Sequence, residues 1–187
     1  PWSTLPRADG VQDGGCAHTA DRVSCWTEDG ATLTSHALAG TRGRIAARAS
    51  ARCAIDGSDL VRCWGSGAGA HPAGTAAAPT YVTDIRRAAS SIATNGDTTC
   101  VVAGAEVWCW GYGAAGQVGN GEWRRASAPT RVLDIDDAVG VAMPSDAACA
   151  LRASGEVWCW GDDTGRQLGD APSSEVSGPV RVVGLPR

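Results

Sequence analysis

Short stretches whose successive side chains would point to opposite faces of a strand recur along the chain, and three of the four clearest end in glycine. The clearest stretch, residues 107–111, reads Val-Trp-Cys-Trp-Gly. In a β-strand Val107 and Cys109 would point to one face, and Trp108 and Trp110 to the other. Because both faces are apolar, such a strand must be covered on both sides. The pattern therefore predicts short β-strands in sheets that pack face to face.

The same pattern occurs four times, and each copy contains two cysteines separated by eight or nine residues. The two clearest copies are residues 100–111 and 149–161, and prolines recur every 50 residues at 79, 129 and 179. One unit reads as a Pro-x-x-Val strand, an Ile/Val-Ala strand, a cysteine strand and a Val-x-Cys-Trp strand. Four short strands in 40 to 50 residues are typical of a propeller blade.

The fold class that we predict is all-β, a β-propeller built from four repeat units that are each a four-stranded antiparallel blade. The chain, residues 1–187, forms a single repeat array with approximate units at 1–40, 41–84, 85–134 and 135–187.

The turn lengths predict how the cysteines pair. If Cys100 lies opposite Cys109, then Gly104 and Ala105 remain as a two-residue hairpin turn, which is a favoured length. The same register leaves an acceptable turn in every unit. The predicted disulfides are Cys16–Cys25, Cys53–Cys63, Cys100–Cys109 and Cys149–Cys159. Zinc ligands are usually separated by two to four residues, so the spacing does not favour a metal site. Disulfides indicate an oxidising compartment, and we expect a secreted or cell-surface protein.

Three pieces of the third unit resemble a known family. They are residues 99–111, residues 116–121 (Gly-Gln-Val-Gly-Asn-Gly) and residues 129–132 (Pro-Thr-Arg-Val), and the fourth unit repeats them at 148–161, 165–169 and 179–185. This pattern resembles the regulator of chromosome condensation (RCC1-like) repeat family, and the cysteine-paired form is similar to repeats of secreted bacterial proteins. The likeness is weaker in the second unit and weakest in the first. It implies a propeller that binds other proteins through loops on one face, as members that bind a small GTPase or a β-lactamase do.

The blade number leaves three arrangements open, because rings of this family usually have seven blades. The chain could be part of a longer array, could join with other copies, or could close as a smaller ring. Residues 4–7 (Thr-Leu-Pro-Arg) echo residues 184–187 (Gly-Leu-Pro-Arg), so the chain starts and stops in the same repeat phase. We expect this from a cut through a longer array.

Composition excludes several functions. The net charge of −4 offers no basic field for nucleic acid, and no apolar run approaches the roughly 20 residues that span a membrane. There is no Gly-x-Ser-x-Gly elbow, phosphate loop or His-Glu-x-x-His motif. We therefore predict no enzyme activity, no cofactor, no metal, no nucleic-acid partner and no membrane insertion.

One loop concentrates residue types that are common at binding hot spots. Residues 112–127 contain Tyr112, Trp123, Arg124 and Arg125, and aromatic and arginine side chains are enriched in such sites. The matching loop of the fourth unit contains Asp162, Asp163 and Arg166. These seven residues are the predicted binding residues, although Trp123 could instead cover the next blade.

These observations predict a non-enzymatic extracellular module that binds a protein partner through loops on one face. One alternative is a structural protein in which another copy of the chain completes a larger propeller or filament. A second is a glycan-binding lectin or hydrolase, in which tryptophans stack on sugars and carboxylates act as acid and base.

Overall fold

The computed structural model describes residues 10–12, 15–26, 33–41, 44–164, 168 and 176–184, and these residues form sixteen β-strands and no helix. The strands make four antiparallel sheets of four strands each, and within each sheet the strands are adjacent in chain order. The predicted all-β fold is therefore confirmed.

The strands of each sheet are short. The first sheet contains β1 (Gly10–Gln12), β2 (Cys16–His18), β3 (Arg22–Trp26) and β4 (Leu33–Ala37). The second contains β5 (Ile45–Arg48), β6 (Ala51–Ile55), β7 (Val61–Gly65) and β8 (Ala76–Tyr81). The third contains β9 (Ala89–Thr94), β10 (Thr98–Ala103), β11 (Glu106–Gly111) and β12 (Ala126–Arg131). The fourth contains β13 (Ala138–Ala142), β14 (Ala147–Arg152), β15 (Val157–Gly161) and β16 (Val176–Arg181).

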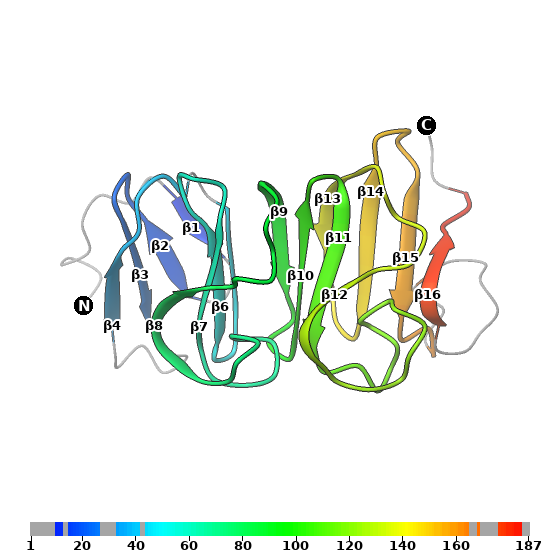
Figure 1. Cartoon of the computed structure of the whole chain (residues 1–187), viewed down its shortest axis with the longest axis horizontal. Helices are drawn as coiled ribbons and strands as arrows, with labels where there is room; N and C mark the ends of the chain where they lie inside the picture. Colours follow the sequence, from blue (N-terminus) through cyan, green and yellow to red (C-terminus); the bar gives the residue numbers. More distant parts are fainter. Residues whose placement is uncertain are drawn as a thin grey trace.

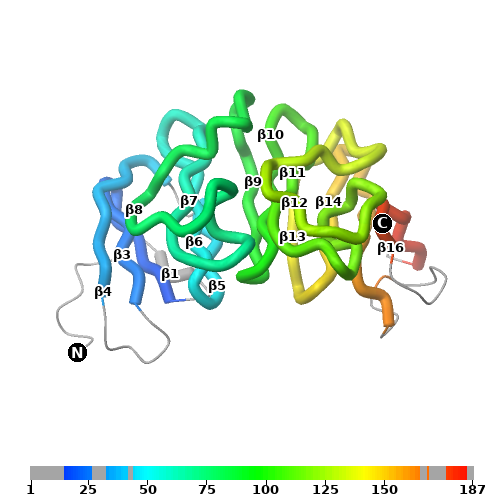
Figure 2. Tube along the Cα trace, turned by 60° about the horizontal axis from the view of Figure 1, so that its bottom comes forward, coloured from blue at the N-terminus to red at the C-terminus, as the bar shows by residue number. Residues whose placement is uncertain are grey.

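The four sheets stand side by side in chain order, with the first and fourth at opposite ends of the row (Figure 1). A view turned by 60° shows the same order, with the first and fourth sheets again at opposite ends of the row (Figure 2). The first strands of neighbouring sheets are in contact, since β5 touches β1 and β9, and β9 also touches β13. Consecutive sheets are therefore arranged as consecutive blades, with their first strands on the inner side.

The register within the hairpins agrees with the turn-length argument. Cys100 lies opposite Cys109, and both Gly104 and Ala105 have positive φ angles, 61° and 67°. Such a pair of residues forms the tight turn that matches the twist of antiparallel strands. All four predicted disulfides are present, and each joins the second and third strands of one sheet.

One detail of the predicted unit is wrong. The predicted unit begins with the proline strand, but β12, which contains Pro129, pairs with β11 and closes the third sheet. The strand that contains Pro79 likewise closes the second sheet. The proline strand is the last strand of a blade because the chain turns back after the Val-x-Cys-Trp strand. It then pairs with the free edge of that same strand.

Each sheet has two chemically different faces. We call the face that carries the two cysteines the disulfide face, and the opposite face the tryptophan face. The tryptophan face carries the residue after the second cysteine, which is Trp26, Trp64, Trp110 or Trp160. At each of the three sheet interfaces, the disulfide face of one sheet packs against the tryptophan face of the next.

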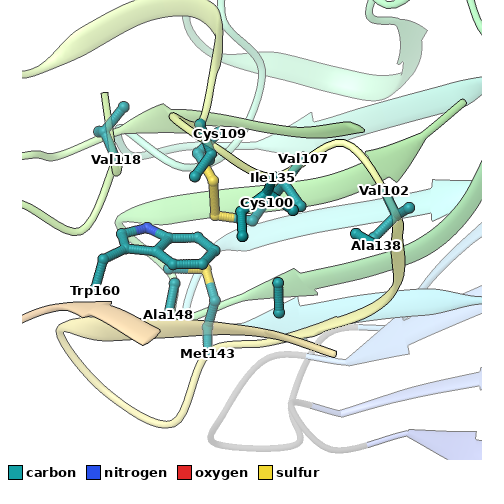
Figure 3. Close-up of a cluster of buried hydrophobic side chains, with 12 residues drawn as sticks. Cys100, Val102, Val107, Cys109, Val118, Ile135, Ala138, Met143, Ala148 and Trp160 are labelled. Atoms are coloured by element: carbon teal, nitrogen blue, oxygen red, sulfur yellow. A yellow bond between two sulfur atoms is a disulfide. The ribbon is translucent and has the colours of Figure 1, made fainter. Parts of the chain in front are cut away.

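The interface between the third and fourth sheets shows this packing in detail (Figure 3). The fully buried indole of Trp160 lies beside the Cys100–Cys109 disulfide, with Met143 and Ala148 next to it. Its Nε1 donates a hydrogen bond to the carbonyl oxygen of Gln117 at 2.9 Å. The disulfide faces therefore form apolar surfaces against which the following sheets pack. This packing also fixes the position of the loops between sheets.

Candidate binding surface

The long loops between the third and fourth strands of the second and third sheets lie at the same end, at the bottom of Figure 1, and in the fourth sheet only residues 162–164 and Leu168 of the corresponding loop are described. Each begins at a glycine with positive φ, Gly65, Gly111 or Gly161. A Cβ atom on Gly111 would lie 2.2 Å from the carbonyl oxygen of Asp97, so only glycine allows the chain to leave the sheet here. The turns between the second and third strands of the sheets occupy the opposite end.

The loop between β11 and β12 is held to the sheet through its backbone. The Tyr112 amide donates to the Asp97 carbonyl at 2.8 Å, and the Thr98 hydroxyl donates to the Tyr112 carbonyl at 2.6 Å. The two arms of the loop also touch, because a Cβ on Gly113 would lie 2.1 Å from the Arg124 carbonyl oxygen. The segment around Tyr112 is thus brought next to Arg124 and its neighbours.

Two large aromatic side chains of this loop remain accessible. Tyr112 is 49% exposed and Trp123 is 46% exposed, although buried Val118 anchors the middle of the same loop. Leu133 adds apolar area, since it is exposed and its Cδ1 would lie 3.3 Å from a Cβ on Gly121. Sequence reasoning missed Leu133, because nothing in its Val-Leu-Asp-Ile setting marks it as exposed.

The arginines of the loop differ in their pairing. Arg124 donates two hydrogen bonds to the Glu122 carboxylate, at 2.8 and 2.9 Å. These bonds lower the pKa of Glu122 and raise the pKa of Arg124 from their ordinary values. Arg125 is exposed, and it has no ion-pair partner among the described residues. Arg125 is therefore the cation in this loop that is available to a partner's carboxylate.

The binding residues predicted in the fourth sheet are not all exposed. Asp163 is fully buried, and its Oδ1 accepts a hydrogen bond from the Leu168 amide at 2.8 Å. It occupies the place that Gly113 has in the third sheet, so its side chain points into the loop and not toward solvent. Asp162 is half-buried and accepts a bond from the Thr164 amide at 3.0 Å. Arg166 lies outside the described residues.

We call Tyr112, Trp123, Arg124 and Arg125 the aromatic–arginine surface. It consists of two half-exposed rings beside two guanidinium groups on a loop whose backbone is tied to the third sheet. This arrangement can bind apolar and acidic groups at once.

The side chain of His71 is held by contacts with the backbone. His71 accepts a bond from the Ala73 amide at its Nδ1, and its Nε2 lies 3.0 Å from the Tyr81 carbonyl oxygen. Within the described ranges no three histidine, cysteine, aspartate or glutamate side chains gather as metal ligands would. These residues also include no helix with the length and apolarity needed to cross a membrane.

Comparison with known proteins agrees with this architecture. Residues 139–167 match the family model of the regulator of chromosome condensation (RCC1) repeat. Human WBSCR16 has a similar structure, with a TM-score of 0.72 and 18% identity over 96% of this chain and 55% of that chain. The fold is that of an RCC1-like β-propeller.

Two yeast structures are similar as well. Yeast RCC1 (Prp20) bound to Kap60 gives a TM-score of 0.66 and 16% identity, over 93% of this chain and 48% of that one. Prp20p from Saccharomyces cerevisiae, which was described with its binding to Gsp1p and histones, gives 0.65 and 13%, over 95% and 52%. The chain thus spans about half the length of the solved structures that it matches. No curated protein matches it in sequence.

Proposed function

We propose that this chain is a non-enzymatic, protein-binding RCC1-like module that holds its partner through the aromatic–arginine surface. The observation that carries the proposal is the exposure of Trp123 and Tyr112 on a loop with a fixed backbone. Large aromatic rings on a rigid support bury much area on binding and lose little conformational entropy. Such residues supply most of the binding energy at protein interfaces.

The charge of the surface indicates the kind of partner. Arg125 is unpaired among the described residues, and Arg124 already holds Glu122, so the loop presents cationic groups next to apolar rings. A partner with carboxylates around an apolar patch would complement both features. Protein partners are also described for the similar yeast structures, namely Kap60 for RCC1 (Prp20) and Gsp1p and histones for Prp20p.

We also propose where the module works. Four disulfides and no free cysteine in the described residues indicate an oxidising compartment. Secretion or display on a bacterial cell surface fits these bonds, and the net charge of −4 argues against a nucleic-acid partner.

Immobilised protein can test this proposal with extracts of cell-surface and secreted proteins. A protein retained by the parent chain is purified, and its dissociation constant is measured for Trp123→Ala and Arg125→Ala. We expect Trp123→Ala to weaken binding by about 2 kcal/mol or more, about thirtyfold, as at other hot spots.

Leu60→Ala is the matched control, because Leu60 is an exposed apolar residue in the hairpin at the opposite end of the sheets. It should bind like the parent. Equal affinity of the parent and both loop variants would refute the proposed surface.

A further inference from the structure

The loop that carries the aromatic–arginine surface is held by the fourth sheet as well as by the third. The Nε1 of Trp160, in β15, donates a hydrogen bond to the carbonyl oxygen of Gln117 in the middle of this loop at 2.9 Å. Gly119 lies against the same indole, because a Cβ on Gly119 would come within 2.6 Å of the indole Nε1. A buried side chain of the fourth sheet therefore contacts a loop that belongs to the third.

The outer strand of the fourth sheet, β16, contacts the same loop at two further places. The Gly121 amide donates a hydrogen bond to the carbonyl oxygen of Ser177 at 2.9 Å. The two backbones also lie close together at Gly116, where a Cβ would be 2.8 Å from the Ser177 Cα and 2.9 Å from the Val176 carbonyl oxygen. Residues 116–121 are thus held by contacts with two strands of the fourth sheet.

Residues 122–125 follow directly on this held segment. They include three of the four residues of the aromatic–arginine surface. After them the chain enters the third sheet at Ala126, the first residue of β12. One end of this short segment is therefore attached to the fourth sheet through Gly121, and the other end is attached to the third sheet. Its position depends on how these two sheets pack together.

Leu133 lies where the two sheets meet on the outside. Its amide donates a hydrogen bond to the Gly119 carbonyl oxygen at 3.0 Å. Its Cδ1 would lie 3.3 Å from a Cβ on Gly121 and 3.7 Å from a Cβ on Gly178, which belongs to β16. The side chain remains 44% exposed. An accessible apolar residue is therefore present where the loop, the end of β12 and β16 come together.

The second sheet has the same kind of contact with the sheet that follows it. The Ala70 carbonyl oxygen of its long loop accepts a hydrogen bond from the Trp110 Nε1 at 3.1 Å. The Gly69 carbonyl oxygen accepts one from the Thr99 hydroxyl at 2.6 Å. In both loops the donors belong to the tryptophan face of the next sheet. A tryptophan face therefore also positions the long loop of the sheet before it.

We propose that Trp160 and the Ser177 backbone are positioning residues for the aromatic–arginine surface, so that binding by the third sheet depends on the fourth. This inference rests on the proposed function, because it concerns the same surface. Trp160 is fully buried and cannot touch a partner. A loop that is already held in its binding conformation loses less entropy when it binds. Loss of the contacts with the fourth sheet therefore weakens binding without removing any group that touches the partner.

Trp160→Phe tests the proposal, because it removes the N–H group that bonds to Gln117 and keeps an aromatic ring at this position. Hydrogen exchange of backbone amides, measured on the protein alone, reports how firmly the loop is held. We expect the amides of Gly121 and Leu133 to exchange about tenfold faster than in the parent, as the loss of one buried hydrogen bond implies.

Trp110→Phe is the matched control, because it removes the equivalent hydrogen bond to Ala70 in the loop of the second sheet. It should accelerate exchange in residues 66–75 and leave the Gly121 amide as in the parent. Far-ultraviolet circular dichroism shows whether both variants are folded. Equal acceleration at Gly121 in the two variants would indicate a general loss of stability and would overturn the proposal.

Gly116→Ala disturbs the contact with β16 by a different route. The added methyl group would meet the Ser177 backbone, and the φ angle of 77° adds strain. Gly155→Ala is its control, because Gly155 has a φ of 85° but no atom lies within 4 Å of its Cβ position. Only Gly116→Ala should accelerate exchange at Gly121. A Gly121 amide that exchanges as in the parent in both Trp160→Phe and Gly116→Ala contradicts the proposal.

Binding of a partner that the immobilised parent chain retains gives the second readout. We expect Trp160→Phe to raise its dissociation constant by about threefold to tenfold, and Trp110→Phe to leave it unchanged. The effect of Trp160→Phe should disappear when Trp123→Ala is already present, since both substitutions then act on the same contact. An affinity that Trp160→Phe does not change overturns the proposal. If the parent retains no protein, the proposed function fails, and the exchange measurements still decide whether the fourth sheet positions the loop.

Discussion

The interface between the first and second sheets differs from the two later ones in how its buried indole N–H is bonded. In the later interfaces the indole Nε1 atoms of Trp110 and Trp160 donate to the carbonyl oxygens of Ala70 and Gln117, at 3.1 and 2.9 Å. Trp64 is equally buried, but its Nε1 has no hydrogen-bond partner among the described residues.

Charged and titratable side chains gather around Trp64. The ring of His36 meets the indole edge-on with ring centres 5.7 Å apart, and Arg52 lies on the tryptophan face with Trp64. Burial lowers the pKa of both residues, and the nearby guanidinium groups of Arg22 and Arg52 lower that of His36 further. The same sheet pairing can therefore give the buried indole N–H an acceptor, or leave it without a described partner beside titratable side chains.

The cause lies in the loop that supplies the acceptor. Ala70 and Gln117 belong to glycine-rich loops of the second and third sheets. Each loop turns back so that one of its carbonyl oxygens lies next to the indole of the following sheet. The corresponding piece of the first unit reads Thr-Glu-Asp-Gly at residues 27–30, which lie outside the described residues. The sequence repeat is weakest in the unit that precedes Trp64, the buried indole whose N–H has no described partner.

The largest loss of stability is expected from replacing Gly119, which lies against the indole of Trp160. A Cβ on Gly119 would lie 2.6 Å from the Trp160 Nε1, and its φ is 75°. Gly119→Ala should therefore lower the free energy of unfolding by about 2–5 kcal/mol, through backbone strain and overpacking together. Thermal or denaturant unfolding measures it.

Gly155→Ala is the control, because Gly155 also has a positive φ, 85°, but no atom lies within 4 Å of its Cβ position. It should cost only about 1–2 kcal/mol from the backbone. Equal costs at the two sites would mean that the indole does not sit on Gly119.

Phenylalanine substitutions sharpen the contrast between the interfaces. Trp110→Phe removes the hydrogen bond to Ala70 and leaves a buried carbonyl unpaired, whereas Trp64→Phe removes no described hydrogen bond. We expect Trp110→Phe to destabilise by about 1–2 kcal/mol more than Trp64→Phe. Urea unfolding of the two variants decides this, and a larger loss at Trp64 would reverse our ranking.

A smaller effect is expected from acid. The folded protein holds the pKa of His36 below the ordinary 6.5, so the unfolded chain binds a proton first as the pH falls. This contribution to stability is complete above pH 6.5 and is lost as the pH falls below that value. Protection of amides in β6 and β7 from hydrogen exchange should drop between pH 7 and pH 5 more than that in β10 and β11.

His36→Gln is the control for this acid effect, since glutamine does not titrate. The extra loss in β6 and β7 should disappear in that variant. If it persists, another group is responsible.

Much of the fold was predictable because it is encoded locally. The turn at Gly104 and Ala105 fixes the register of Cys100 and Cys109, and alternation assigns Trp108 and Trp110 to one face. These features depend on neighbours in the chain, so one sequence is enough to find them.

The rest depends on contacts between distant segments. The packing of His36 on Trp64, for example, depends on how two sheets meet. Exposure of Tyr112 and Trp123 likewise depends on which sheet follows. Residue types mark such positions as candidates, but only packing decides whether a side chain is buried.

The central claim is that every sheet is closed by its own disulfide, and that the disulfide faces of the first three sheets pack against the next sheet's tryptophan. Peptide mapping of the unreduced protein tests it most directly. The account predicts four linked pairs, Cys16–Cys25, Cys53–Cys63, Cys100–Cys109 and Cys149–Cys159, and a mass gain of about eight daltons on reduction. Free thiols, or a bond between cysteines of different sheets, would contradict it.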